Sequence, residues 1–574
     1  MGLLTWITLL PLLGALLIML VPKEEESIHR GLALTVAVAT FLVSLLLLPE
    51  FDATEAGFQL QVNKAWVPAL GITFHLGVDG ISLWLVLLTT LMVPLTLLAP
   101  QAMGTRNVHV REFMVAMLVL ETGMIGAFLA LDLFVFYVFW ELMLVPMYFI
   151  IGIWGGERRL YASIKFVIYT LVGSLLMLAA ILYLYVQAHA LTGAWTFAYD
   201  TYAALTLPRL PQLLCFGAFT LAFMIKVPLF PLHTWLPDAH VEAPTGGSVI
   251  LAAVLLKFGA YGFLRFAMPM FPLAAWQMGP LLAVLSVIGI IYGALMAYVQ
   301  DDIKKLVAYS SVSHLGFVIL GLLALNPQGI QGGIYQMLAH GISTGGLFLA
   351  VGVLYDRRHT RRLADFGGLW AKMPVFAACF LVVVLASVGL PGLCGFVGEF
   401  LVLVGTFNAG KTWQEFGLPS QMPMVWHPMV MAALSATAVI LAAMYLLSMY
   451  QKVMFGPYRP AGTLGGSPHP PAMGSGGQGP PAPDAIQPEN RDPHIKDITG
   501  RERIVFATII AAAVVMGVWP KPILDRTESS VKTFLSSYRD RLRDSVAQPT
   551  APAHFYPAPP AGVAPKAAPA EVKP

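Results

Sequence analysis

The sequence predicts an all-α polytopic membrane protein with about 14 transmembrane helices, and three observations support this fold class. The 574 residues are 57% hydrophobic and only 11% charged, whereas soluble domains carry about 25% charged residues. Apolar runs of about 20 residues, the length that crosses a bilayer as a helix, follow one another along most of the chain. The basic residues between these runs gather on one side of the expected membrane.

Fourteen apolar runs are predicted to span the membrane as helices. They lie at residues 3–22, 31–49, 80–100, 112–131, 133–154, 161–187, 211–229, 246–267, 279–299, 304–325, 330–355, 373–408, 428–455 and 503–520. The run at 373–408 is broken in its middle. The first run has no basic residue before it and no small-residue cleavage site after it, so we interpret it as a spanning helix rather than a signal peptide.

The orientation follows from the basic residues in the connecting loops. If the N-terminus lies outside, the inner loops hold 19 lysines and arginines, and the outer loops hold four when the C-terminal tail is left aside. Because basic loops stay on the cytoplasmic side, both termini are predicted to face outward.

Three segments are predicted to lie outside the bundle. Residues 456–502 and 547–574 are so rich in Pro, Gly and Ala that they cannot bury enough apolar surface to offset chain entropy, and we interpret them as a disordered linker and tail. Residues 521–546 place apolar side chains on one helical face with charges opposite, which predicts a helix on a membrane or protein surface. That face comprises Val531, Phe534, Leu535, Tyr538, Leu542 and Val546.

Composition also excludes several functions. A net charge of only +3 gives no reason to expect nucleic acid as a partner. The three cysteines, Cys215, Cys379 and Cys394, lack the CxxC or Cys/His spacing of an iron–sulfur or zinc site, and no disulfide framework is expected. No redox motif is present, so we expect no cofactor and no metal in this chain.

Four charged residues are singled out as deep within the apolar runs: Glu141, Lys226, Lys257 and Glu399. A charge in the middle of a bilayer costs about 2.5–3.5 kcal/mol on insertion scales, so each is a functional hypothesis by default. One reading is that they form structural salt bridges between helices. The other is a proton switch, because burial weakens the proton affinity of an amine and a nearby carboxylate restores it.

Histidines add a possible link between these charges. His314 and His340 lie within neighbouring predicted helices, and an imidazole can relay protons near neutral pH or serve as a hydrogen-bonded packing residue. Two of them between a lysine and a glutamate favour the relay. His233 and His240, with Asp238, flank the inner end of the helix that follows Lys226, where they either admit protons or are solvated loop residues.

The spacing of helix breaks indicates an internal repeat. Pro228 and Pro391 are 163 residues apart, and Lys226 and Glu399 are 173 apart. Pro/Gly-broken helices in corresponding places are typical of a repeat that carries a transport site. With five helices in each unit, the second copy is inverted. The predicted parts are N-terminal helices at 1–100, a first repeat at 112–267, a second repeat at 279–455 and a final helix at 503–520.

Several long motifs carry a family resemblance. The stretches FYVFWELMLVPMYFIIGIWGG, KVPLFPLHTWLPDAHVEAPTGG and QMLAHGISTGG closely resemble the NuoM-type antiporter-like subunit of respiratory complex I, the proton-pumping NADH:quinone oxidoreductase. The resemblance covers about residues 1–455 and 503–520.

The resemblance implies a proton half-channel in each repeat, joined by a hydrated polar axis at mid-membrane. By position, Glu141 pairs with Lys226 and Lys257 is the central lysine. His314 and His340 continue the axis, and Glu399 is the terminal exit group.

Partners and location are implied in the same way. They are the other membrane-arm subunits of complex I, namely NuoL-type and NuoN-type neighbours and the lateral helix of the NuoL-type subunit, together with the lipid bilayer and protons. Redox and quinone chemistry would occur in other subunits. The chain would be a multi-pass protein of the bacterial cytoplasmic (inner) membrane with both termini periplasmic.

Three alternatives remain open from the sequence. One is a stand-alone or Mrp-type cation/proton antiporter, against which Glu399 argues because those chains and the sister subunits usually have Lys there. The others are a membrane-arm subunit of a proton-pumping hydrogenase and a passive scaffold in which the ion pairs are purely structural.

Overall fold

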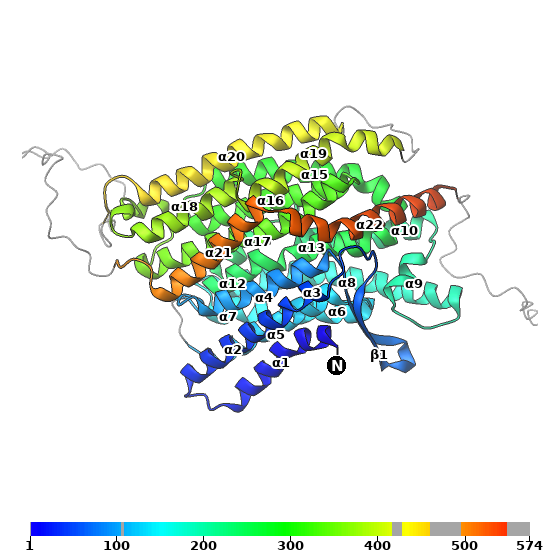
Figure 1. The fold of residues 1–574 in the computed structure, drawn as a ribbon, viewed down its shortest axis with the longest axis horizontal. Helices are drawn as coiled ribbons and strands as arrows, with labels where there is room; N and C mark the ends of the chain where they lie inside the picture. The colour runs from blue at the N-terminus through cyan, green and yellow to red at the C-terminus, as the bar shows by residue number, and fades with distance from the viewer. Residues whose placement is uncertain (1, 105–107, 416–426, 460–494, 548–574) are drawn as a thin grey trace, which may run out of the picture.

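The computed structural model describes residues 2–104, 108–415, 427–459 and 495–547 and shows a bundle of long helices that run side by side (Figure 1). The predicted linker at 456–502 and tail at 547–574 fall mainly on residues 460–494 and 548–574, which lie outside the described residues.

The N-terminal part and the predicted first repeat supply the first helices of the bundle. The N-terminal helices are α1 (Leu3–Leu20), α2 (Glu26–Leu45), α3 (Leu47–Glu50) and α4 (Ser82–Leu98). They are followed by α5 (Val110–Leu129), α6 (Leu133–Leu142), α7 (Leu144–Trp154), α8 (Arg159–Thr192), α9 (Tyr199–Ala204), α10 (Arg209–Lys226), α11 (Trp235–Glu242), α12 (Thr245–Ile250), α13 (Lys257–Gly262) and α14 (Met268–Met270). Two π-helical turns, η2 (Leu251–Leu255) and η3 (Phe263–Ala267), flank α13.

The predicted second repeat and the C-terminal part supply the rest. Their helices are α15 (Pro272–Tyr298), α16 (Ile303–Leu323), α17 (Pro327–Arg358), α18 (Pro374–Val388), α19 (Cys394–Glu415), α20 (Pro428–Met454), α21 (Gly500–Val518) and α22 (Lys521–Ala547). Short 3₁₀ turns, η4 (Leu363–Asp365) and η5 (Leu369–Ala371), connect α17 to α18.

The described residues include ten helices that are long and apolar enough to cross a membrane, or up to eleven if the bent pair α21 and α22 counts as one span. The apolar helices α4 and α18 are shorter than this test requires. The bundle is thus that of an all-α polytopic membrane protein. The number of fourteen spans stays a prediction.

A β-hairpin, which the sequence analysis did not predict, corrects the purely helical description of residues 1–100. It pairs β1 (Gln59–Val67) with β2 (Ile72–Val78) in antiparallel register, and the 3₁₀ turn η1 (Pro68–Leu70) connects them. The chain reverses at Gly71, whose φ of +67° suits a residue without a Cβ. The segment is too short and too polar to cross a bilayer, so a search for spanning helices passes over it.

Two helix breaks occur where Pro and Gly predict them. After α10 the chain is not helical over residues 227–234, before α11, and after α18 it is not helical over residues 389–393, before α19. Lys226 is the last residue of α10, whereas Glu399 lies in the second turn of α19. The two breaks therefore place one ionisable side chain each next to an irregular stretch of backbone.

The amphipathic helix α22 packs across one face of the bundle, as Figure 1 shows. Val531, Tyr538 and Leu542 on its apolar face are each 1% exposed. The Tyr538 hydroxyl donates a hydrogen bond of 3.0 Å to the carbonyl of Pro272, and the Gln331 side chain donates one of 3.2 Å to the carbonyl of Leu524. These contacts connect α22 to the starts of both α15 and α17.

Candidate functional site

Glu141 is the second-last residue of α6, two residues before Met143, where the α-helix is interrupted. Pro146 of α7 has no backbone N–H to donate to the carbonyl of Leu142, which accounts for the interruption at this point. The carboxylate is half-buried, and its Oε1 has no hydrogen-bond partner among the described residues. Its described polar partner is the side chain of Tyr137, one helical turn earlier on α6, and not Lys226.

Lys226 ends α10 because Pro228, two residues on, lacks the N–H that would continue the helix. The side chain is buried, with 2% exposure. Its Nζ lies 5.0 Å from the centre of the Trp140 ring and 5.8 Å from that of Phe166. Within the described residues no ion pair joins Lys226 to Glu141, so the direct pair implied by the resemblance is not formed in this structure.

The two rings around Lys226 are themselves held in place. The Phe223 ring meets Trp140 edge to face at 5.5 Å, and the Trp235 ring lies 5.3 Å from Phe166. The Trp235 Nε1–H donates a 2.9 Å hydrogen bond to the carbonyl of Ile225, which lies next to the helix break. The aromatic cage, Trp140 and Phe166, is thus a packed part of the protein around a buried amine.

Lys257 lies between the π-helical turns η2 and η3 and is fully buried. Its Nζ donates to the carbonyl of Ala252, 2.5 Å away within η2, and lies 2.7 Å from Nδ1 of His340 on α17. A π-helical turn alters the backbone hydrogen bonding of a helix and often marks a functional position. The structure therefore brings the central lysine and one of the predicted histidines into direct contact.

His314 and Glu399 form a second direct contact. Nδ1 of His314 lies 2.9 Å from Oε1 of Glu399, and both side chains are at least nine-tenths buried. The Gln336 amide donates to the same oxygen at 3.2 Å, and the Tyr445 hydroxyl lies 3.5 Å from Nε2 of His314. The carboxylate is thus supported from α16 and α17, and the histidine also from α20.

A glycine shapes the pocket of Glu399. Gly389, in the break after α18, has a φ of +84°, and a Cβ added there would lie 2.9 Å from Oε2 of Glu399. Only glycine combines this left-handed backbone with the close approach of the carboxylate.

The structure therefore groups the predicted residues in two contacting pairs with gaps between them. Lys257 touches His340 and His314 touches Glu399, while the rings of His314 and His340 are 5.8 Å apart between centres. Nε2 of His340 has no partner among the described residues. Glu141 and Lys226 lie at the other end, close enough to interact electrostatically but without a direct bond.

Sequence reasoning missed several residues of this site. They are Trp140 and Phe166 around Lys226, and Gln336 and Tyr445 around the His314–Glu399 pair. Trp140 precedes Glu141 directly, which was an available signal. The others lie on different helices from their partners, so no local pattern identifies them.

Further polar groups lie on α5, α8 and α11 and in the break that follows Lys226. Lys165 of α8 forms an ion pair of 2.6 Å with Asp238 of α11. His233 and His240 are buried rather than solvated, and neither Nδ1 has a partner among the described residues. Glu121 of α5 is fully buried, with both carboxylate oxygens unpaired in the described chain.

Within the part of the chain that the structure describes, no group of three or more His, Cys, Asp or Glu side chains is arranged to hold a metal ion. The chemistry that the buried groups can perform by themselves is the binding and transfer of protons, because they comprise amines, imidazoles and carboxylates.

Comparison with known sequences gives consistent matches over nearly the whole chain. Residues 130–417 match the family described as NADH:quinone oxidoreductase/Mrp antiporter, and residues 6–127 match that described as NADH-ubiquinone oxidoreductase chain 4, amino terminus. The NADH-quinone oxidoreductase subunit M of Rhodobacter capsulatus is 43% identical over 96% of this chain and 99% of its own length.

Solved structures agree with these matches. A chain of respiratory complex I from Thermus thermophilus superposes with a TM-score of 0.75 at 34% identity, covering 94% of this chain and 99% of that one. A chain of the Mrp complex from Dietzia superposes with a TM-score of 0.74 over 94% of this chain, but at 19% identity it shows only that the fold is shared.

Proposed function

This chain belongs to the family of NADH-quinone oxidoreductase subunit M, the antiporter-like membrane subunits of complex I, and from this premise we propose that its buried axis moves protons from Glu141 towards Glu399. It is a proton-translocating membrane-arm subunit of an oxidoreductase complex. The reduction of quinone by NADH belongs to other subunits, and this chain supplies a path for protons.

The observation that carries the proposal is the pair of direct contacts within the buried axis. Lys257 and His340 are 2.7 Å apart, and His314 and Glu399 are 2.9 Å apart. At these distances a proton passes between an amine and an imidazole, or between an imidazole and a carboxylate, without large movement of either group. A purely structural ion pair needs neither the histidines nor their order along the axis.

Lys226 acts as the switch at the start of the axis. When Glu141 approaches, its negative charge favours the protonated amine, and when Glu141 withdraws, the remaining partners are the rings of Trp140 and Phe166. A desolvated cation–π contact is worth about 2 kcal/mol, weaker than a buried charge pair, so withdrawal lowers the proton affinity of Lys226. The released proton then passes to Lys257.

Two movements complete the transfer. The proton on Lys257 passes to Nδ1 of His340, and a rotation of the imidazole or a bridging water carries it across the 5.8 Å between the two histidine rings. His314 then delivers it to Glu399. Gln336 holds the receiving oxygen of Glu399 in position.

Free energy for the transfer comes from outside this chain. Each charge that crosses the membrane works against about 2.3 kcal/mol per 100 mV. The neighbours that deliver this energy are the NuoL-type and NuoN-type subunits and the lateral helix of the former, in a bacterial inner membrane, with both termini of this chain on the periplasmic side. The excess of basic residues in the inner loops supports this orientation.

The test is NADH-driven proton pumping in proteoliposomes that hold the complex with Glu141→Ala. Because loss of a positioned proton-transfer group typically slows a reaction by about 100-fold or more, we expect pumping to fall at least about tenfold in a fully assembled complex. Glu121→Gln is the matched control, since it also removes a buried acid, one whose carboxylate oxygens have no hydrogen-bond partner among the described residues. Normal pumping by assembled Glu141→Ala would show that the carboxylate is not part of the path.

A further inference from the structure

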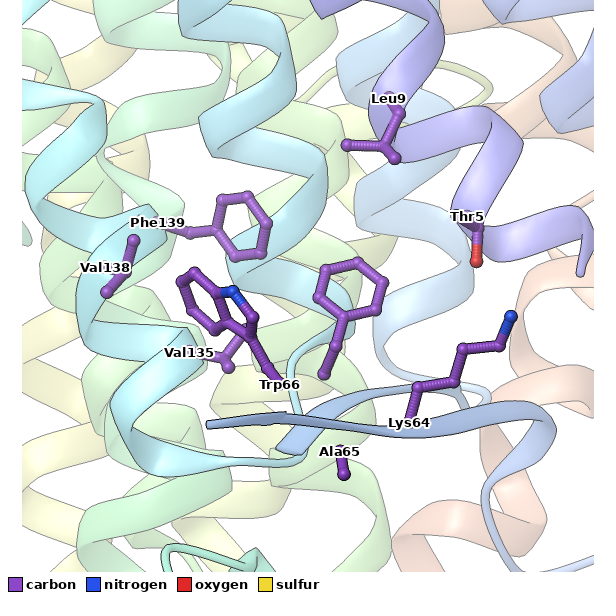
Figure 2. A pocket seen from close by; sticks show the side chains of 9 residues that line it. Thr5, Leu9, Lys64, Ala65, Trp66, Val135, Val138 and Phe139 are labelled. Carbon is purple, nitrogen blue, oxygen red and sulfur yellow. The ribbon is translucent and has the colours of Figure 1, made fainter. Parts of the chain in front are cut away.

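A pocket of about 450 Å³ opens between α1, the β-hairpin and α6 (Figure 2). Leu9 of α1, Trp66 of β1, Phe74 of β2 and Phe139 of α6 line it, and most of its wall is apolar. Both α1 and the span that contains α6 are apolar enough to cross a membrane. The pocket therefore adjoins the bilayer, where the surrounding solvent is lipid.

One end of the pocket is polar. Thr5 is 6% exposed as a residue, and its hydroxyl oxygen is buried without a hydrogen-bond partner among the described residues. Lys64 is exposed on β1 and forms no ion pair in the described chain. Figure 2 shows the Lys64 amine and the Thr5 hydroxyl at the same end of the pocket, with the Trp66 and Phe139 rings towards the other. A buried hydroxyl without a partner is costly, so this end is suited to a ligand that supplies one.

We propose that the pocket binds one anionic phospholipid, with a phosphate oxygen at Lys64 and Thr5 and an acyl chain along Leu9, Trp66 and Phe139. Lys64 donates only, and the Thr5 hydroxyl can donate to the same anion, so the polar end selects negative charge. Leu9 lies one helical turn beyond Thr5 on α1, so the apolar wall leads from the polar end into the membrane-spanning part. A lysine and a tryptophan at this level are typical of a membrane–water interface.

The position gives the lipid a structural role. Val135, Val138 and Phe139 bring the pocket wall onto α6, the helix that carries Trp140 and Glu141. A bound acyl chain packs against this helix just before its interruption at Met143 and restrains its position. The inference stands independently of the proposed proton path, because it rests on the shape and chemistry of the pocket.

The test uses the intact complex in lipid nanodiscs with a phosphatidylglycerol probe that carries a photoreactive diazirine in its acyl chain. Mass spectrometry of the digested subunit locates the adducts, which we expect on the peptides that contain Leu9, Trp66 or Phe139. Loss of one basic contact to an anionic lipid weakens binding about fivefold, so Lys64→Gln should lower labelling by about that factor. Unlabelled phosphatidylglycerol should compete, whereas phosphatidylcholine and inorganic phosphate should not.

Two further variants keep the result interpretable. Lys411→Gln removes an exposed lysine on α19, far from the pocket, and should leave labelling unchanged. Leu9→Trp fills the pocket without changing its charge and should abolish labelling while the complex stays assembled.

Three outcomes would overturn the proposal. Equal competition by phosphatidylcholine would show that the pocket is an apolar surface that does not distinguish lipid headgroups. Labelling that neither Lys64→Gln nor Leu9→Trp changes would show that the probe binds elsewhere. Absence of any adduct, together with crosslinking of a photoreactive residue at position 66 to a neighbouring subunit, would show that protein fills the pocket.

Discussion

The two ends of the buried axis use the same kinds of side chain but differ in how closely these meet. At the start, Lys226 rests against two aromatic rings and makes no ion pair with Glu141. Further along, Lys257 touches His340 and His314 touches Glu399 at hydrogen-bond distances. The first arrangement can change with a small movement of one acid, whereas the second is already connected. The comparison indicates a switch, formed by Glu141 and Lys226, followed by a conductor, which comprises the contacting pair of Lys257 and His340 and the contacting pair of His314 and Glu399.

Local structure explains the difference. Glu141 and Lys226 each lie near the end of a helix that a proline interrupts, so the regular backbone hydrogen bonding stops beside them. His314 and His340 lie in the interior of the long helices α16 and α17, which are buried almost throughout their length. A contact between two such helices is held by all of their packing.

The largest expected effect is on the conductor. Lys257→Met removes the amine that joins the two ends and keeps the length of the side chain, so we expect proton pumping per NADH to fall at least about tenfold. Pumping and quinone reduction are measured together in proteoliposomes. Lys532→Met on the exposed face of α22 is the control, since its only described ion pair is with Glu528. Unchanged pumping would mean that protons bypass Lys257.

A smaller effect is expected at the aromatic cage. Trp140→Leu removes a cation–π contact of about 2 kcal/mol from Lys226 but leaves the Phe166 ring, so it should slow pumping about fivefold, while Trp140→Phe keeps an aromatic face and should retain most of it. The pH dependence of pumping should shift in Trp140→Leu, because the proton affinity of Lys226 changes.

An alternative is that Trp140 has only a structural role, and the same two variants distinguish this role from a role in the switch. If the indole only fills space, Trp140→Leu and Trp140→Phe will differ in assembly but not in the pH profile of the complexes that assemble. That result would remove the aromatic cage from the switch.

The smallest expected effect is at the support of the conductor. Tyr445→Phe removes a hydroxyl 3.5 Å from Nε2 of His314, a weak contact, so pumping should fall less than about twofold. The measurement is the initial pumping rate at several pH values. A loss as large as that of Lys257→Met would show that Tyr445 itself passes protons, and the conductor would then include α20.

Much of the fold was predictable because its signals are local. Runs of apolar residues indicate spanning helices wherever they occur, and the two Pro/Gly-rich stretches indicate the breaks after Lys226 and before Glu399. The β-hairpin at 59–78 was not predicted from the sequence, because a short alternating segment between long apolar runs gives only a weak strand signal.

The choice of candidate site residues also rests on a local signal, because a charge within a membrane span is costly and conspicuous. Glu141, Lys226, Lys257 and Glu399 are predicted as site residues for that reason, and their role stays a prediction. The side chains that contact them in the structure carry no such signal. Gln336 and Tyr445 are ordinary residues on other helices, and nothing in their own neighbourhood of the chain points to His314 or Glu399.

The sequence by itself thus determined that this protein is a membrane bundle with a few buried charges and two broken helices, since hydropathy and helix-breaking act over a few neighbouring residues. Only the tertiary structure decided which charges touch. Lys257 meets His340 across 83 positions of sequence, and Lys226 lies on a tryptophan instead of its expected acid. Such distances depend on how helices pack and which rotamers fit, and a change of one or two ångströms converts a bond into a gap.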